Sequence, residues 1–149
     1  MVGITAEDKM MMIKLLLATL CGGLIGLERE IHGKEAGFRT HSLVSIGSAL
    51  IMLVSVDIYE VYRNIAPVDP SRIAAQVVSG IGFLGAGAII RSPKGISGLT
   101  TAASLWVSAG IGLAVGAGLF KPAFVSTLLV LIVLFLFGQM GRRMGWKDV

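Results

Sequence analysis

Charged residues are scarce in this chain. Only 15% of its 149 residues are Asp, Glu, Lys or Arg, whereas 54% are apolar and the mean hydropathy is +0.83. A soluble domain carries about a quarter charged residues, so we expect the apolar excess of this chain to face the lipid bilayer. The composition predicts an all-α protein that crosses a membrane several times.

Residues for covalent, redox or metal chemistry are also few. The single cysteine, Cys21, lies in an apolar run and has no partner for an intramolecular disulfide. The sequence has no P-loop, zinc-protease or serine-hydrolase motif. Aromatic residues, 7% of the chain, do not alternate with Lys or Arg on one face, which argues against nucleic-acid binding. We therefore expect a protein that is not an enzyme and has no cofactor.

Five apolar segments are long enough to cross a bilayer as helices, which takes roughly 17 to 25 residues each. The gaps between them hold charges, prolines or both, and they are too short for a second domain. We therefore predict one transmembrane domain over residues 1–149, with Gly33 as a stop for the first helix. The predicted spans cover residues 10–27, 41–59, 72–90, 100–119 and 122–137.

The distribution of Lys and Arg predicts the orientation, because these residues near span ends resist translocation. One side of the predicted bundle holds eight of them and the other side holds five. We therefore predict an N-terminus outside and a C-terminus in the cytoplasm. The richer side comprises Arg29, Lys34, Arg39, Arg91, Lys94, Arg142, Arg143 and Lys147, and the poorer side Lys9, Lys14, Arg63, Arg72 and Lys121.

Small residues recur at helical spacing in the first, third and fourth predicted spans. Helices in a bilayer associate by close packing over Gly, Ala and Ser. The G-x-G-x-x-G string at residues 80–85 lies within a span, and Leu105 stands about 20 positions on where a dinucleotide site has an acidic residue. We interpret it as packing glycine. The residues predicted to pack are Gly22, Gly26, Gly80, Gly82, Gly85, Gly87, Ser104, Ser108, Gly112 and Gly116.

These small-residue faces leave alternatives open. We favour close packing inside one bundle over a seam for self-association. In the glycine-rich third span, a broken helix whose backbone lines a cavity is a further alternative. A small bundle with such faces is expected to bind a copy of itself, as a homodimer.

Ionisable residues at membrane depth are costly and are functional candidates by default. One group, Glu28, Arg29, Arg39 and His41, is predicted at the cytoplasmic ends of the first two spans. A carboxylate there could hold a hydrated Mg²⁺, with Glu28 as the metal ligand. The alternative, weighted equally, is an interfacial loop in which Glu28 and Arg29 pair with neighbouring residues.

A second polar group is predicted on the outer side. We favour an ion pair between Asp57 and Arg72, which would tie the second span to the third, over a ligand site. Gln76 lies one turn deeper than Arg72, so its amide needs a partner helix or a bound species. In the fourth span, the hydroxyls of Thr101 and Ser104 can bond back to the preceding turn.

Four strings of residues together resemble the MgtC/SapB family. The likeness covers about the first 120 residues in the right order, and the third string is the most specific. The strings are Gly-Leu-Glu-Arg-Glu at 26–30, Arg-Thr-His at 39–41, the glycine-rich run at 72–87, and Gly-Leu-Thr-Thr-Ala-Ala-Ser-Leu-Trp at 98–106.

The resemblance implies a protein of five spans in the bacterial inner membrane, linked to magnesium limitation, to virulence, and to restraint of the membrane ATP synthase. The polar residues that it implies are Glu28, Arg29, Arg39, Arg72, Gln76 and Thr101. MgtC-type members have a cytoplasmic C-terminal domain, whereas this sequence stops soon after the fifth predicted span. Thr100 and Val107 also stand where some members have Asn and Cys. We therefore expect a short, SapB-like member.

Two functions follow from these patterns. In the first, the bundle is a non-enzymatic regulator that binds another membrane protein, such as an ATP synthase subunit, through its glycine seams. In the second, it is a small transporter of Mg²⁺ or another ion. Arg72 and Gln76 would then line the path with Glu28 at its inner mouth, and the transporter would need an oligomer.

Overall fold

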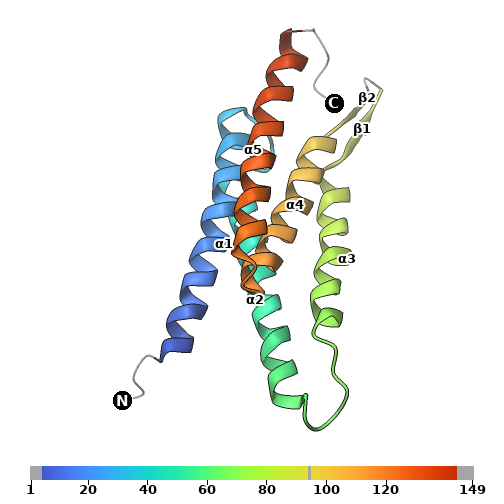
Figure 1. The fold of residues 1–149 in the computed structure, drawn as a ribbon. Helices are drawn as coiled ribbons and strands as arrows, with labels where there is room; N and C mark the ends of the chain where they lie inside the picture. Colours follow the sequence, from blue (N-terminus) through green and yellow to red (C-terminus); the bar gives the residue numbers. More distant parts are fainter. Residues whose placement is uncertain (1–4, 94, 144–149) are drawn as a thin grey trace.

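The computed structural model describes residues 5–93 and 95–143, with side chains as far as residue 140, and it is mostly helical (Figure 1). Of the basic residues used for the orientation, Lys94 and Lys147 lie outside these residues, as do the side chains of Arg142 and Arg143. The elements are α1 (Ala6–Ile31), α2 (Phe38–Tyr62), α3 (Ser71–Ala88), β1 (Ile90–Ser92), β2 (Gly95–Ser97), α4 (Leu99–Gly116) and α5 (Phe120–Arg143).

Four helices, α1, α2, α4 and α5, are long and apolar enough to cross a membrane. The helix α3 is not among them, because its 18 residues include Arg72 and Gln76 as well as several glycines. The chain is therefore a helical membrane protein whose described residues contain four candidate spans. A fifth crossing, by α3, stays a prediction.

The helix α1 extends beyond the predicted span at both ends. It begins at Ala6 because Thr5 and Asp8 form a capping box, in which the Thr5 hydroxyl accepts a hydrogen bond from the Asp8 amide over 3.1 Å. It ends at Ile31, two residues before Gly33, which adopts a left-handed conformation with φ +64°. The predicted stop at Gly33 is confirmed.

The helix α3 ends two residues before the predicted third span does. The helix α3 stops at Ala88, and β1 and β2 then form an antiparallel hairpin. Pro93 cannot continue a helix, and Gly95 and Gly98 adopt positive φ angles of +129° and +85° that favour glycine. The described part of the chain is therefore mostly helical, with a short hairpin of two three-residue strands added to the predicted helices.

The N-terminus of α3 is fixed against α2. The Ser55 hydroxyl of α2 donates a hydrogen bond to the Pro70 carbonyl, and the Asp69 carboxylate accepts one from the Ser71 amide over 2.8 Å. Hydrogen bonds from the Ser71 side chain and amide also hold the pKa of Asp69 below its usual range. The helix is unbroken from Ser71 to Ala88, so the alternative of a broken helix in the third span is wrong.

The helices α1 and α2 touch through their backbones. A Cβ atom placed on Gly22 would lie 2.5 Å from the carbonyl oxygen of His41, and one on Gly26 would lie 2.6 Å from that of Gly37. Real Cβ atoms do not approach other atoms so closely, so only glycine fits at these two positions. The small-residue seam of the first span therefore packs inside the bundle.

The seam of α4 packs against α2 in the same way. A Cβ atom on Gly112 would overlap the carbonyl oxygen of Ser45, and one on Gly116 would lie 2.6 Å from that of Ala49. The Lys14 ammonium of α1 donates a hydrogen bond to the Gly116 carbonyl over 3.0 Å, which satisfies a free carbonyl at the end of α4. The three helices α1, α2 and α4 thus form the packed core.

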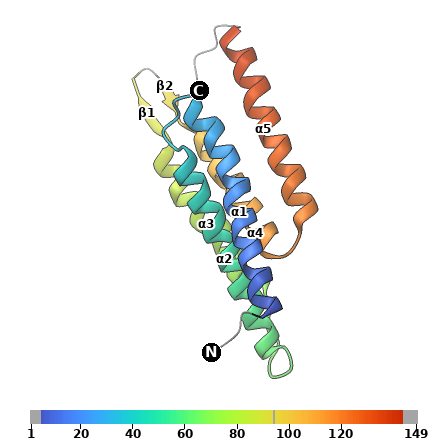
Figure 2. The same ribbon diagram turned by 90° about the vertical axis from the view of Figure 1, so that its left-hand side faces the viewer.

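The helices α3 and α5 lie on opposite sides of this core (Figure 2). On α3, a Cβ atom placed on Gly85 would make an ordinary contact of 3.7 Å with Ala102 of α4. Nothing lies within 4 Å of such an atom on Gly80, Gly82 or Gly87. Close packing of these three glycines inside the bundle is therefore a wrong prediction: Gly80 borders a groove toward α2, and the other two have no described neighbour within reach.

We expect Gly112→Leu to destabilise the protein by about 1–3 kcal/mol, since the new side chain overlaps the α2 backbone. Thermal unfolding followed by circular dichroism in detergent micelles measures this loss. The matched control is Gly110→Leu on the same helix, because Gly110 is exposed and a Cβ atom there meets nothing within 4 Å. Equal stability of the two variants would contradict the internal seam.

Candidate functional site

A buried cluster of polar side chains lies where α1, α2 and α4 meet. We call it the polar junction; its members are Glu28, Arg29, His41, Thr101 and Ser104. The predicted site residues Arg39, Arg72 and Gln76 lie elsewhere. The junction exists because the glycine contacts of α1 and α4 bring both helices against α2.

His41 is the centre of the polar junction. Its side chain is fully buried, and its ring nitrogens Nδ1 and Nε2 each lie 2.9 Å from a partner, the Gly37 carbonyl and the Ser104 hydroxyl. Because a carbonyl oxygen only accepts hydrogen bonds, Nδ1 must carry a hydrogen. The Nε2 atom links α2 to α4 across 63 positions of sequence.

The Ser104 hydroxyl has two neighbours that compete for its single hydrogen. Its oxygen lies 2.8 Å from the Thr101 carbonyl and 2.9 Å from Nε2 of His41. With a neutral ring, Ser104 donates to Nε2; with a charged ring, Ser104 accepts from Nε2 and donates to Thr101. The direction of this hydrogen bond therefore depends on the charge of His41.

Glu28 and Arg29 form an ion pair at the edge of the polar junction. Arg29 Nε lies 2.5 Å from Glu28 Oε2, and the two side chains are only 5% and 12% exposed. The other carboxylate oxygen, Oε1, lies 3.0 Å from Nδ1 of His32 but is buried without a hydrogen-bond partner among the described residues, because that nitrogen bonds to the Glu28 carbonyl over 2.8 Å. The paired arrangement is therefore the one that the structure contains.

This pairing bears on the predicted Mg²⁺ site. Among residues 5–93 and 95–143, no three His, Cys, Asp or Glu side chains gather closely enough to hold a metal ion. Arg29 occupies one oxygen of the Glu28 carboxylate and would compete with a cation for it. Metal ligation by Glu28 stays a prediction.

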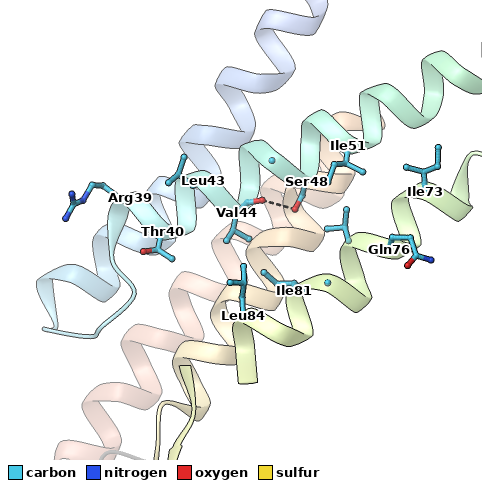
Figure 3. Close-up of a pocket in the computed structure, with 13 residues that line it drawn as sticks. Arg39, Thr40, Leu43, Val44, Ser48, Ile51, Ile73, Gln76, Ile81 and Leu84 are labelled. Atoms are coloured by element: carbon cyan, nitrogen blue, oxygen red, sulfur yellow. Dashed lines mark hydrogen bonds between the residues drawn. The ribbon is translucent and has the colours of Figure 1, made fainter. Parts of the chain in front are cut away.

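Arg39 and Gln76 line a groove between α2 and α3, with a volume of about 880 Å³ (Figure 3). Arg39 lies at the end of the groove near the start of α2, and Gln76 lies near the other end, with its amide directed away from α2. The walls between them are mostly apolar. The two predicted site residues are therefore separated by most of the length of the groove.

The predicted ion pair between Asp57 and Arg72 is wrong. Both residues belong to the described chain and are exposed, yet no ion pair joins them. Ser55 faces α3 and bonds to Pro70, and two residues further along a helix the side chain is turned by about 200°. Asp57 therefore points away from Arg72.

A row of buried hydroxyls on α2 and α4 was not predicted as part of the site. The hydroxyls of Ser42, Ser45 and Ser108 are buried and have no hydrogen-bond partner in the described part of the chain. Ser45 follows His41 by one turn and Ser108 follows Ser104 by one turn, so the row extends the polar junction into the bundle. The four-residue spacing of polar residues on α2 was the available signal.

The sequence model of the MgtC family matches residues 15–143. The chain is 46% identical to "Putative magnesium transporter YhiD" of Escherichia coli K12, over 91% of this chain and 64% of that protein. It is 44% identical to Protein MgtC of Salmonella typhimurium LT2 (93% and 59%) and 42% identical to Protein SapB of Bacillus subtilis (93% and 61%). The chain thus spans about three fifths of the length of these curated relatives. No solved structure matches it.

We expect Ser104→Ala to lower the free energy of unfolding by about 1–3 kcal/mol, because the change removes the partner of a fully buried ring nitrogen. Chemical unfolding in detergent micelles gives this value. Ser79→Ala, at an exposed position of α3, is the matched control and should change stability by less than about 0.5 kcal/mol. If both variants lose equally little, the His41–Ser104 contact does not stabilise the fold.

Proposed function

Because the chain belongs to the MgtC family, we propose that it is a non-enzymatic regulator of the bacterial inner membrane that acts in magnesium homeostasis by binding another membrane protein. Family membership and the relatives named MgtC and YhiD support the magnesium context. The distribution of small and polar residues over the helices supports the binding role.

We further propose that all five helices cross the membrane. The His41–Ser104 contact and the approach of Gly116 to Ala49 show that α2 and α4 run parallel. The helix α3 connects the end of α2 to the start of α4, so it has to return the chain through the same thickness. The excess of basic residues then favours an N-terminus outside and a C-terminus in the cytoplasm.

The observation that carries the proposal is the exposed face of α3. This face has no neighbour among the described residues. The glycine seams of α1 and α4 already pack against α2, so Gly112 and Gly116 are not available to a partner. We therefore place partner binding on this face of α3. We call it the α3 face; its residues are Arg72, Ala75, Gln76, Ser79, Gly82, Phe83, Ala86 and Gly87, all exposed.

The α3 face has the composition of a helix-packing surface. Ala75, Ser79, Gly82 and Ala86 follow one another at helical spacing, so a second helix can approach the backbone closely. Beside them Phe83 is 83% exposed and can serve as an apolar anchor. Within the hydrocarbon of the bilayer, these small residues gain close dispersion contacts when a second helix packs against them. The second helix can also supply a hydrogen-bond partner for the amide of Gln76.

The proposed occupant of the α3 face is a transmembrane helix of a partner protein. A subunit of the membrane ATP synthase is the candidate that the MgtC/SapB resemblance implies, and a second copy of this chain, as a homodimer, is the alternative. The relatives are longer than this chain, so restraint of ATP synthase and a link to virulence are proposals for it.

We expect Gly82→Leu to lower the yield of the co-purified membrane partner about tenfold, which corresponds to a loss of 1.4 kcal/mol in binding. The protein should remain folded, because a Cβ atom on Gly82 meets nothing within 4 Å. Gly110→Leu, at an exposed position of α4, is the control and should leave the yield unchanged. The measurement is quantitative mass spectrometry of proteins purified from cross-linked membranes; an unchanged yield with Gly82→Leu would refute the role of the α3 face.

Ion transport is the second candidate function. The name of the YhiD relative mentions magnesium transport, and Arg72 and Gln76 lie exposed on α3 in this chain. Against it stands the separation of the polar residues, because the apolar walls of the groove lie between Gln76 and the end of the bundle that holds Glu28. A transporter would therefore need a path completed by a second copy.

In proteoliposomes of the folded protein we expect no Mg²⁺ uptake above that of empty liposomes. An internal fluorescent Mg²⁺ indicator measures the uptake. Uptake that is abolished by Glu28→Gln or by Gln76→Leu, with expression unchanged, would establish the transport function and place the path beside that residue.

A further inference from the structure

The groove between α2 and α3 is hollow because glycine lies on both of its walls. No atom lies within 4 Å of a Cβ atom placed on Gly47 of α2 or on Gly80 of α3. Apolar side chains flank these two glycines, and the Ser48 hydroxyl is occupied by the Val44 carbonyl over 2.7 Å (Figure 3). The middle of the groove therefore offers apolar surface and no free polar group.

The dimensions of the groove match one leaflet of a bilayer. Along α2 it runs from Arg39 to Ile51, which is about 18 Å at 1.5 Å per residue. Half of a hydrocarbon core is about 15 Å thick. The volume of about 880 Å³ lies within the usual range of small-molecule sites, roughly 300 to 1,000 Å³.

Arg39 is the one charged side chain among the 13 residues that line the groove. Arg39 lies in the first turn of α2, is exposed, and forms no ion pair among the described residues. Thr40 follows Arg39 on α2 and also lines the groove, and none of the 13 lining residues is acidic. The helix α2, at 25 residues, is about 37 Å long. When the centre of α2 lies at the midplane of the bilayer, its first turn therefore lies at the level of the lipid headgroups.

We infer that this groove binds an anionic phospholipid, with the lipid phosphate at Arg39 and Thr40 and one acyl chain along Gly47 and Gly80. Arg39 supplies charge-assisted hydrogen bonds to the phosphate. The apolar walls exclude water from the chain, and the glycines leave the space that it fills. The inner end of the groove, near Ile51 and Ile73, lies where an acyl chain of one leaflet would end.

The site is tested by native mass spectrometry of the full chain released from detergent micelles. Phosphatidylglycerol and phosphatidylethanolamine with identical acyl chains are the probes, and we expect selective retention of phosphatidylglycerol. Gly80→Leu fills the groove from α3, Gly47→Leu fills it from α2, and Arg39→Gln removes the charge at its mouth. Arg39→Gln should lower retention of phosphatidylglycerol about fivefold, the factor that corresponds to roughly 1 kcal/mol for one basic residue at an anionic surface. Each leucine variant should also lower it, because the side chain fills the place of the acyl chain.

Two matched controls accompany these variants. Gly82→Leu places the same side chain on α3 outside the groove, and Arg72→Gln removes an exposed charge that does not line it. Both should retain phosphatidylglycerol as the unmodified protein does. Circular dichroism reports whether each variant is folded, and Arg39→Gln leaves the packing unchanged, so it tests the site even if a leucine variant misfolds.

Four results would overturn the inference. Equal retention of the two lipids would show that Arg39 does not select a headgroup. Unchanged retention in folded leucine variants would show that the chain does not lie in the groove. Displacement of the lipid by inorganic phosphate would show that the site is only a surface contact for anions. If the leucine variants instead lost a protein dimer and kept the lipid, the groove would bind a second copy of the chain.

Discussion

Lipid tails are as apolar as leucine, so helices in a bilayer gain little from hydrophobicity alone and associate by close packing and polar contacts. In this protein the close packing comes from glycine on α1 and α4, whose Cα atoms approach carbonyl groups of α2. Gly22, Gly26, Gly112 and Gly116 each occupy a place where a Cβ atom would collide with the α2 backbone. The core of three helices, α1, α2 and α4, depends on this contact.

The polar junction is a consequence of the same contact. His41 is fully buried and reaches Ser104 because the backbones of α2 and α4 approach each other at Gly112 and Gly116, about two and three turns after Ser104. The Ser104 hydroxyl then donates its hydrogen to the ring when the ring is neutral and to the Thr101 carbonyl when the ring is charged. The Glu28–Arg29 pair lies beside them, so the two buried charges of the polar junction are paired with each other.

The helix α3 has the opposite character. It meets the core along one side, through residues such as Ile81 and Gly85, and leaves its other glycines without neighbours. Gly80 opens a groove toward α2, whereas Gly82 lies on a face that nothing in the described chain covers. The proposed lipid site and the proposed partner site therefore lie on adjacent faces of α3 that share Gln76, and substitutions at Gly80 and Gly82 separate them.

Composition and spacing alone determined the helical membrane character, the stop at Gly33 and the glycine seams of α1 and α4. These features are local, because apolar length, a left-handed glycine and four-residue spacing act within one helix.

Only the tertiary structure decided which face of each helix finds a neighbour. The spacing of Gly82 resembles that of Gly112, yet only Gly112 meets another backbone. Asp57 and Arg72 have opposite charges and lie at neighbouring span ends, so the sequence predicts an ion pair. In the structure Ser55 faces α3, and the helical rotation between Ser55 and Asp57 points Asp57 away from Arg72. Such outcomes depend on the rotation of each helix about its axis, which follows from the packing of all helices together.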